Sequence, residues 1–413
     1  MLREDRIEMV VGVSFKGKIH EVAGVRLSAV SAGIRYKDRP DLVLIELAEG
    51  TTVAGVFTQN AFCAAPVLIA KSHLSSSNPR IFIINTGNAN AGTGEPGQQN
   101  AIKCCQIVAE HAQVSVEQVL PFSTGVIGEE LPVEKIAAGV PQALDLLGAN
   151  NWMDAAHGIL TTDTRPKLVS KQIEVAGGVL TVTGMAKGAG MIRPNMATML
   201  SYVFTDAIID KDTLDKITAR LVNGSFNRIT IDGDTSTNDA AMLAATGKSE
   251  ISISNLETTE QEKYFSCLQY VFERLAVELV KDAEGATKFI TINISEGKDE
   301  QECLKVAYCV AESLLVKTAL FASDPNWGRI LAVIGRAGLE SLEIFKVDID
   351  VGNVRIVSGG KIADSYTEED GQAVMKHEEI CITINLGRGN AKETVWTSDL
   401  SHDYVRINAD YRT

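Results

Sequence analysis

Short apolar runs and longer segments of helical periodicity alternate along the first half of the chain. A short apolar run bounded by turn residues is typical of a buried strand, whereas apolar residues three and four apart are typical of an amphipathic helix. On this basis we expect strands at residues 42–47, 53–57 and 81–84. The same criteria predict helices at residues 98–112 and 133–147. Helix and strand are therefore mixed from the beginning of the chain.

The second half of the chain begins with more helix and ends with more strand. Helices are predicted at residues 211–222, 237–245 and 260–280, and a strand at 228–231. Further along, strands are predicted at residues 289–294, 345–349, 353–357, 380–386 and 393–397, and helices at 303–311 and 327–337. Consecutive strands without a helix between them favour a layered α+β fold over a doubly wound parallel sheet. The change in pattern predicts a C-terminal αβ subdomain at residues 286–413.

Length and composition predict an ordinary globular protein of two or three packed units, since the 413 residues are 45% hydrophobic and 22% charged. A net charge of −14, with no basic stripe, argues against nucleic acid as a partner. No apolar run approaches the ~18 residues of a membrane span. The first residues fit neither a secretory signal nor a transit peptide, and seven cysteines without a CxxC pair suit reduced thiols. We therefore expect a cytoplasmic location.

The segment K-G-A-G-M-I-R-P-N-M-A-T-M-L, residues 187–200, places Thr198 between a glycine-rich loop and an apolar run. A Thr198 hydroxyl that attacked the Ala197 carbonyl would start an N→O acyl shift, and hydrolysis would leave Thr198 as a new N-terminus. Its α-amine, with a reference pKa near ~8, would then serve as a general base beside the hydroxyl. The alternative is an ordinary loop that enters a buried strand.

Other motifs are weaker. The G-x-G-x-x-G match at residues 92–97 lies too far behind its strand for dinucleotide binding and is read as a turn. The loop N-T-G-N-A-N-A, residues 85–91, is either a polar binding loop or a structural turn. The stretch D-G-D-T-S-T-N-D, residues 232–239, has Thr237 and Leu243 where a calcium loop needs its glycine and glutamate. Its acidic residues are expected to cap a following helix, and orientation of site residues is the alternative. Six scattered histidines include no metal-ligand pair, so no metal is predicted.

An acyl transfer also needs donors for the developing oxyanion, and the segment P-F-S-T-G-V-I-G at residues 121–128 offers two. Thr124 has a hydroxyl, and Gly125 has an N–H that a ligand can approach closely. A simple turn is the alternative.

Taken together these segments closely resemble the ornithine acetyltransferase family of arginine biosynthesis, the glutamate N-acetyltransferases called ArgJ. The resemblance runs essentially from end to end. Its motifs are N-T-G-N-A-N-A-G-T-G (85–94), S-T-G-V-I-G (123–128), T-T-D-T (161–164), the segment at 187–200, D-G-D-T-S-T-N-D, S-D-P-N-W-G-R (323–329) and the terminal N-A-D-Y-R-T. The resemblance implies a layered αββα sandwich of the self-cleaving type with a smaller αβ C-terminal subdomain.

The resemblance also implies roles for single residues. Self-cleavage between Ala197 and Thr198 would give an α chain of residues 1–197 and a β chain of residues 198–413, with two copies of each in the assembly. Thr198 would carry the acetyl group, and Thr124 and Gly125 would form the oxyanion hole. The substrate-binding positions would be Thr161, Lys187, Thr198, Glu284, Asn408 and Thr413.

The expected reaction is transfer of acetyl from N-acetylornithine to glutamate through acetyl-Thr198, without a metal or organic cofactor. Some members of the family also use acetyl-CoA as a donor, and the sequence leaves that choice open. An aminopeptidase or amidohydrolase of the related self-cleaving superfamily is the alternative enzyme. A non-catalytic binding protein is the third class, which predicts an uncut chain of 44.4 kDa.

Overall fold

The structure is a computed structural model of the 413-residue chain, and it describes residue 11 and residues 17–193 and 199–410. Contacts within the chain divide it into two units. The sandwich unit contains Ser14–Asn227 and Thr235–Leu279, and the C-terminal unit contains Met1–Val13, Arg228–Asp234 and Val280–Thr413. Each unit has its own sheets and its own core, and each is described by itself.

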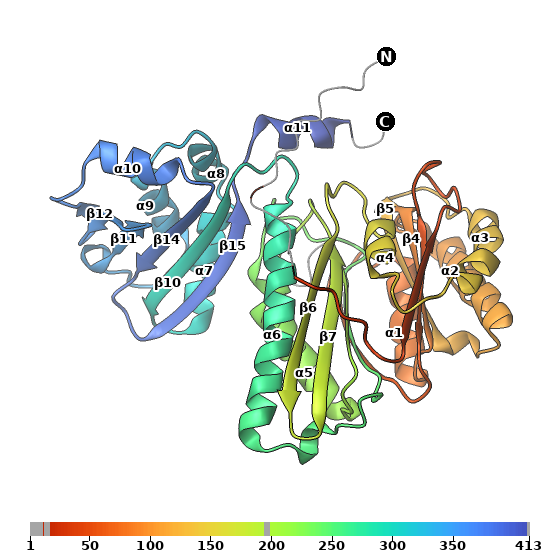
Figure 1. The fold of residues 1–413 in the computed structure, drawn as a ribbon. Coiled ribbons are helices and arrows are strands. Elements are labelled where there is room, and N and C mark those ends of the chain that lie inside the picture. The colour runs from red at the N-terminus through yellow and green to blue at the C-terminus, as the bar shows by residue number, and fades with distance from the viewer. Residues whose placement is uncertain (1–10, 12–16, 194–198, 411–413) are drawn as a thin grey trace. The chain divides into compact units, whose positions relative to one another are not determined.

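Two β-sheets form the centre of the sandwich unit (Figure 1). The first sheet has the order β1-β2-β4-β5, with β1 (Val25–Val30), β2 (Leu42–Leu47), β4 (Ile81–Asn88) and β5 (Val119–Val126). The second has the order β3-β9-β8-β7-β6, with β3 (Thr52–Phe57), β6 (Lys167–Val175), β7 (Gly178–Lys187), β8 (Leu200–Thr205) and β9 (Ala240–Ala245). In each sheet one pair is parallel, β4 with β5 and β8 with β9.

The two sheets face each other across one apolar core. Phe82 of β4 and Phe122 of β5 pack against Tyr202 of β8, and the ring centroids of Phe122 and Tyr202 lie 5.2 Å apart. The residues that alternate with them, such as Ile81 and Ile83, belong to a second core on the outer side of the first sheet. Because both faces of β4 are buried, its first four residues, 81–84, form a continuous apolar run and do not alternate with polar residues.

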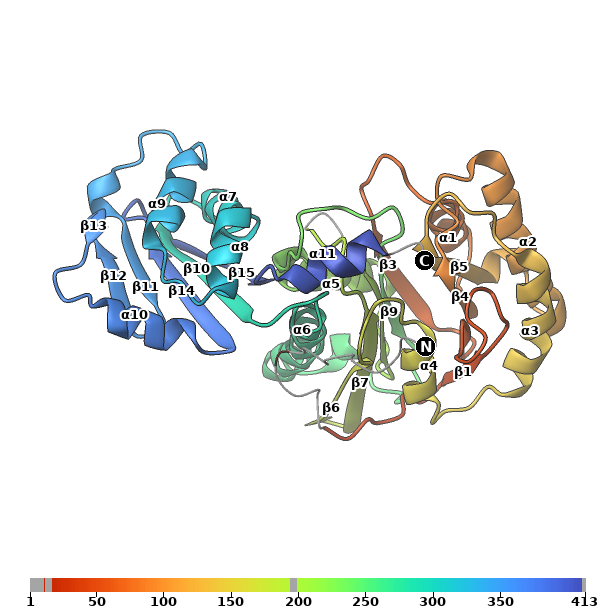
Figure 2. The ribbon, with the colours of Figure 1, turned by 90° about the horizontal axis from the view of Figure 1, so that it is seen from above.

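Helices cover the outer faces of both sheets, so the layers follow the order α, β, β, α (Figures 1 and 2). The first sheet is covered by α2 (Gly94–Ala112) and α3 (Val133–Asp145). The second is covered by α5 (Lys211–Gly224) and by α6 (Thr258–Lys281), whose Leu275 reaches Gly184 of β7. Two further helices, α1 (Ala65–Ser76) and α4 (Trp152–Gly158), contribute side chains to the core between the sheets.

The C-terminal unit has a single sheet, and four of its helices, α7 to α10, pack with that sheet into one core. The sheet has the order β13-β12-β11-β14-β10-β15 and consists of β10 (Phe289–Gly297), β11 (Asp348–Val351), β12 (Val354–Ser358), β13 (Lys361–Ile362), β14 (Glu379–Asn385) and β15 (Ala391–Ser398). Its helices are α7 (Glu300–Ala311), α8 (Leu314–Phe321), α9 (Trp327–Arg336), α10 (Glu368–Met375) and α11 (His402–Ala409).

Buried apolar residues alternate with partly exposed polar residues along β10, so the C-terminal sheet packs on one face. Ile290, Ile292 and Ile294 are buried in the core with side chains of α7, α8, α9 and α10, whereas Thr291 and Asn293 between them are partly exposed. A sheet with one face in the core and one face towards solvent is typical of α+β architecture. The expected fold class, a layered αββα sandwich with a smaller αβ unit, is confirmed.

The predicted strands at residues 42–47, 53–57 and 81–84 are confirmed, as are the helices at 98–112, 133–147, 211–222 and 260–280. In the C-terminal unit the expected strand at 345–349 begins later, at Asp348, because Ile344–Lys346 form a 3-10 turn. The remaining expected strands and helices of that unit lie within one to three residues of their predicted bounds.

Two predictions are wrong. The expected helix at 237–245 is a strand, β9, because the run A-A-M-L-A-A is fully buried between β3 and β8, and this burial outweighs the helix propensity of alanine. The motif at residues 232–239 therefore caps no helix. The expected strand at 228–231 is reduced to one bridge between Ile229 and Trp396, preceded by a 3-10 turn at Phe226–Arg228.

Within the part of the chain that the structure describes, no helix is both long enough and apolar enough to cross a membrane.

Candidate active site

The proposed oxyanion residues lie where two parallel strands end in contact. Thr86 is opposite Thr124 and Gly87 is opposite Gly125, and the register becomes irregular at Asn88. Gly125 has a φ of +137°, and a Cβ at this position would lie 2.2 Å from the Gly87 carbonyl carbon. Only glycine fits such a backbone, so the sequence T-G at this site has a structural cause.

Lys187 links the second sheet to this position. It is the last residue of β7, it is 3% exposed, and its Nζ donates a hydrogen bond of 3.1 Å to Thr124 Oγ1. Thr124 belongs to the first sheet, and its side chain lies on the same side of β5 as Phe122, which is in the core between the sheets. The ammonium group therefore reaches Thr124, the proposed oxyanion residue, across the space between the sheets.

A buried carboxylate balances the charge of this lysine. Asp163 accepts hydrogen bonds from Gly188 N at 2.6 Å and from Thr161 N at 3.1 Å, and it forms a buried ion pair with Lys167. Burial raises the pKa of Asp163, but the charges of Lys167 and Lys187 and these hydrogen bonds outweigh burial and hold the pKa well below its usual range. Asp163 is therefore ionised at neutral pH.

Sequence reasoning missed Asp163, although it lies inside the T-T-D-T motif that supplied Thr161. Asp163 pairs with Lys167 and lies within electrostatic reach of Lys187, and all three groups are buried. The backbone N–H of Thr161 donates to the same carboxylate. The available signal was an acidic residue four positions before a lysine, in the polar segment T-T-D-T-R-P-K at residues 161–167. It became informative only when the fold placed Lys187 beside both.

Ala197 and Thr198, the expected cleavage site and nucleophile, lie outside the described residues. Met199, which follows them, is buried at the entrance to β8. Its N–H donates to Asp239 Oδ1 at 3.0 Å, and its carbonyl accepts from Ala240 N at 3.2 Å. Burial raises the pKa of Asp239 well above its usual range, and the Met199 N–H and the charge of Lys187 oppose this only in part.

The asparagine-rich segment at residues 85–91 is the end of β4, through Asn88, and the structural turn that follows it. Its amide side chains are buried, and each donates to backbone carbonyl oxygens nearby: Asn85 to Asn88, Asn88 to Glu129 and Glu130, and Asn90 to Gly97. Because the amides hold the backbone in place, the structure favours the turn over a polar binding loop.

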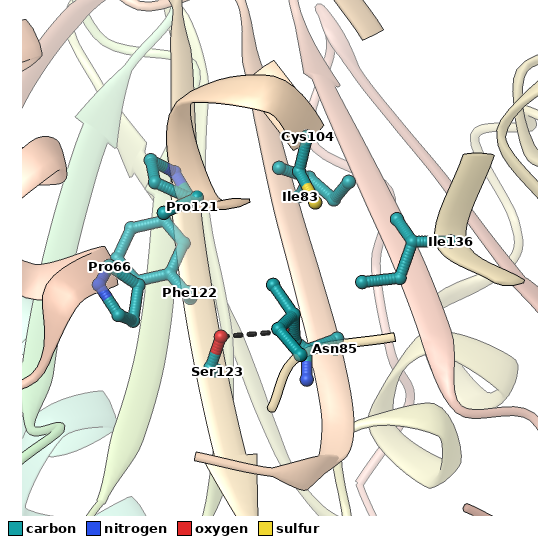
Figure 3. A pocket seen from close by; sticks show the side chains of 10 residues that line it. Pro66, Ile83, Asn85, Cys104, Pro121, Phe122, Ser123 and Ile136 are labelled. Atoms are coloured by element: carbon teal, nitrogen blue, oxygen red, sulfur yellow. Dashed lines mark hydrogen bonds between the residues drawn. The ribbon is translucent and has the colours of Figure 1, made fainter. Parts of the chain in front are cut away.

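A small pocket lies beside β5, the strand that carries Thr124 and Gly125 (Figure 3). It is lined by Pro66, Ile83, Asn85, Ala101, Cys104, Pro121, Phe122, Ser123, Leu131 and Ile136. At its polar end Ser123 donates to Asn85 Oδ1 at 2.5 Å, and burial raises the pKa of the Cys104 thiol to about 12. Ile83, Cys104, Leu131 and Ile136 of this lining belong to the core beneath α2 and α3, whereas Thr124 lies on the face of β5 towards the other sheet. This pocket is a packing gap of the scaffold and is separate from the polar groups around Lys187.

The C-terminal unit brings together two further predicted residues. Asn408 of α11 donates to Glu284 Oε2 at 2.8 Å. The turn after Glu284 is fixed by Ser401, whose hydroxyl donates to the Gly285 carbonyl at 2.6 Å, and Gly285 has a φ of +67°. Glu284 is buried and Asn408 is exposed. The Glu284 carboxylate is therefore held by the exposed Asn408 amide on one side and by the fixed turn at Gly285 on the other. Thr413, the last predicted substrate-binding residue, lies outside the described residues.

Comparison with known proteins agrees with the resemblance seen in the motifs. The ArgJ family model matches residues 26–413. The chain is 55% identical to the arginine biosynthesis bifunctional protein ArgJ of Pseudomonas fluorescens (strain Pf0-1), over 98% of this chain and 100% of that protein. It is 54% identical to the protein of the same name from Psychrobacter arcticus, again over 98% of this chain and 100% of that one.

Among solved structures, the ArgJ protein of Bacillus halodurans is 38% identical, with a TM-score of 0.48, over 51% of this chain and 99% of that chain. The ornithine acetyltransferase of Mycobacterium tuberculosis, solved with ornithine, is also 38% identical, with a TM-score of 0.40, over 42% of this chain and 92% of that chain. The family match covers nearly the whole sequence, and the chain belongs to the ArgJ family.

Proposed function

We propose that this protein is an acetyltransferase of arginine biosynthesis, which transfers acetyl from N2-acetyl-L-ornithine to L-glutamate through an acetyl-threonine on Thr198. The observation that carries the proposal is the end-to-end identity of more than half of the residues with proteins named for this pathway. The geometry around Thr124 and Lys187 supports it, because it supplies the polar groups that acyl transfer needs.

Maturation is the first step of the proposal. The Thr198 hydroxyl attacks the Ala197 carbonyl, the peptide nitrogen leaves as an amine, and an ester joins Ala197 to Thr198 Oγ. Water hydrolyses this ester. The products are an α chain of residues 1–197 with a new carboxylate and a β chain of residues 198–413 with a free α-amine on Thr198.

Acetyl transfer then proceeds in two halves. In the first, the α-amine takes the hydroxyl proton, Thr198 Oγ attacks the acetyl carbonyl of acetylornithine, and ornithine leaves with that proton on its amine. In the second, the deprotonated amine of glutamate attacks the acetyl ester, N-acetylglutamate leaves, and Thr198 Oγ regains a proton. Each half passes through a tetrahedral oxyanion, for which Thr124 and Gly125 are the proposed donors.

The Lys187–Thr124 hydrogen bond supports this role for Thr124. An ammonium group can only donate, so the Thr124 oxygen is the acceptor in that bond. The hydroxyl proton of Thr124 is then directed to another acceptor, and the adjacent positive charge strengthens it as a donor. A hydroxyl polarised in this way in a buried site is suited to a developing negative charge.

The proposed substrate contacts are Thr161, Lys187, Thr198, Glu284, Asn408 and Thr413. Both substrates are amino acids, with a carboxylate that a lysine can bind and an amine that a glutamate can bind. Acetyl-CoA is the second donor that we propose to test. The rest of the proposal is an assembly of two α and two β chains in the cytoplasm, with these small molecules as partners.

Acetyl transfer by the purified protein tests the proposal. N-acetylornithine labelled in the acetyl group is incubated with glutamate, and labelled N-acetylglutamate and free acetate are both quantified. We expect the label in N-acetylglutamate, and we expect two bands smaller than 44.4 kDa on a denaturing gel. Label recovered only in acetate would instead establish the amidohydrolase alternative, and an uncut, inactive chain would contradict both.

Thr198→Ala should abolish cleavage and transfer together, because one hydroxyl serves both. Thr318→Ala on α8 is the matched control, since Thr318 is an exposed threonine. Its hydroxyl donates to backbone carbonyls of its own helix and accepts a hydrogen bond from Arg329. A parallel reaction with labelled acetyl-CoA in place of acetylornithine decides whether the enzyme also uses that donor.

A further inference from the structure

The two strands that carry the proposed chemistry belong to different sheets of the sandwich unit. Thr124 and Gly125 are on β5 of the first sheet, and Met199 precedes β8 of the second sheet. Strands of different sheets share no ladder of backbone hydrogen bonds, so their separation depends on side chains. Acyl transfer is sensitive to that separation, because a misplacement of about 1 Å can reduce the rate about 100-fold.

Two consecutive residues before β9 make polar contacts with both strands. The Asn238 side-chain amide donates to Ser123 O at 3.0 Å and to Ala89 O at 2.6 Å. The Asp239 carboxyl accepts from Met199 N at 3.0 Å. Ser123 directly precedes the oxyanion residue Thr124, and Met199 directly follows the nucleophile Thr198 in the sequence.

The surroundings of Asn238 fix the direction of its amide. Its Oδ1 accepts from the Thr237 hydroxyl at 2.6 Å, and its backbone N–H donates to the Ser236 hydroxyl at 3.1 Å. The two amide hydrogens are thereby directed to the carbonyls of Ser123 and Ala89. Asn238 is 7% exposed and Asp239 is 1% exposed, so these bonds form where water does not compete.

The Asp239 carboxyl can form more hydrogen bonds than the one that it accepts from Met199 N. Its Oδ2 is buried and makes no hydrogen bond to the residues that the structure describes. A buried polar oxygen without a partner costs free energy, so a fold that retains it needs a reason. The neighbouring charged group is Lys187, the residue that bonds to Thr124.

We propose that Asn238 and Asp239 are positioning residues for acetyl transfer. The Asn238 amide holds the oxyanion strand at Ser123, the Asp239 carboxyl holds the nucleophile strand at Met199, and the peptide bond between them sets the separation. The inference rests on the proposed function, since it assigns Thr198 as nucleophile and Thr124 and Gly125 as oxyanion donors.

The fold offers a close control for each residue. Asn151 is also an amide that bridges two backbone carbonyls, those of Leu27 and Leu146, both at 3.0 Å. Asp206 is also a buried carboxyl that accepts one backbone N–H, from Thr181 at 2.9 Å, and it follows the opposite end of β8. Neither control contacts β5 or Met199 among the bonds described.

Steady-state kinetics per cleaved enzyme, together with the cleavage rate on a denaturing gel, test the inference. We expect Asn238→Ala and Asp239→Ala to lower kcat about 100-fold with less than a threefold change in KM, and to slow cleavage. Asn151→Ala and Asp206→Ala should leave kcat within about threefold of the wild type. Equal losses in the controls and the variants, or normal kcat in both variants, would overturn the inference.

The conservative variant Asp239→Asn separates positioning from folding. Its amide oxygen can still accept from Met199 N, and its NH2 group replaces Oδ2, so at least a third of the wild-type kcat should remain. A loss as large as that of Asp239→Ala would overturn the inference even if the alanine variant fails to fold. If the wild type transfers no acetyl, the proposed function fails, and the cleavage rates of the same variants still test the positioning role.

Discussion

Lys187 Nζ donates to Thr124 Oγ1 across the core of the sandwich unit, over 3.1 Å. The lysine belongs to the second sheet and the threonine to the first, so one buried hydrogen bond joins the two layers at the proposed oxyanion site. Hydrogen bonds to charged groups contribute more than neutral ones, at about 1.5–3 kcal/mol each. The contact is therefore strong enough to affect both the shape and the polarity of the site.

Lys187→Met removes the ammonium group and keeps most of the side-chain volume. We expect kcat/KM for acetylornithine to fall at least 100-fold, because Thr124 loses its polarising partner and the substrate loses a cation. Lys211→Met, at an exposed ion pair with Asp215, is the control for Lys187→Met.

Thr124→Val should lower kcat about 100-fold, whereas the kcat of Thr124→Ser, which keeps the hydroxyl, should remain within tenfold of the wild-type value. Equal activity in Thr124→Val and Thr124→Ser would exclude the hydroxyl from catalysis.

Gly125→Ala should destabilise the sandwich unit by at least about 3 kcal/mol, because its Cβ would overlap the Gly87 backbone. Gly33→Ala is the matched control. Gly33 also has a positive φ, +71°, but nothing lies within 4 Å of its Cβ position, so we expect a loss of only about 1 kcal/mol. Urea unfolding of both variants in a Thr198→Ala background, which removes cleavage as a variable, measures the difference. Similar losses of stability in Gly125→Ala and Gly33→Ala would show that β4 and β5 can move apart at Gly125.

Asp163 makes stability depend on pH in a specific direction. The pKa of Asp163 in the folded protein lies below its unfolded value of about 3.9. Its contribution to the free energy of unfolding is therefore fully present above about pH 3.9 and is lost as the pH falls further. At pH 7, Asp163→Asn removes the negative charge that faces Lys167 and Lys187 and should lower the free energy of unfolding by about 3–5 kcal/mol. The difference in free energy of unfolding between the wild type and Asp163→Asn, measured by urea unfolding at several pH values, should become smaller below about pH 4. Asp215→Asn, at an exposed pair, should cost less than about 1 kcal/mol at any pH.

Glu284 and Asn408 should affect binding more than chemistry. If they bind substrate as proposed, Glu284→Gln and Asn408→Ala should raise KM for acetylornithine or glutamate about tenfold while self-cleavage proceeds normally, since cleavage involves no substrate. Glu379→Gln is the control, because Glu379 is an exposed carboxylate of the same unit that pairs with Lys281. Slow cleavage together with unchanged KM would remove both residues from the binding site.

The sequence predicted the parts of this molecule that depend on local pattern. The apolar runs of β2 and β4 and the periodicity of α6 were sufficient for their assignment. The sequence indicated Gly125 as a point that a ligand can approach, but it did not indicate that the Gly87 backbone also packs there. Residues whose meaning comes from distant partners were misread. The run A-A-M-L-A-A resembles a helix until β3 and β8 enclose it.

The same limit applies to the site. Asp163 meets Lys187 from 24 positions away in the sequence, and Asp239 meets Met199 from 40 positions away. Neither spacing corresponds to a helical or strand period, so no local rule connects these pairs. The expected helix cap at residues 232–239 followed from the cluster of acidic residues there, one of which, Asp239, accepts a hydrogen bond from Met199 N in the structure.

The order of the second sheet determines how the matured protein would behave. A cut between residues 197 and 198 assigns β3, β7 and β6 to one product and β9 and β8 to the other, and each product contributes neighbouring strands to one sheet. The pairs β3–β9 and β7–β8 would then be hydrogen-bonded ladders between separate polypeptides. Such products cannot part without unfolding the sandwich. We expect the two chains to co-purify through native chromatography and to separate only in denaturant, and either half expressed alone to expose a bare sheet edge and aggregate.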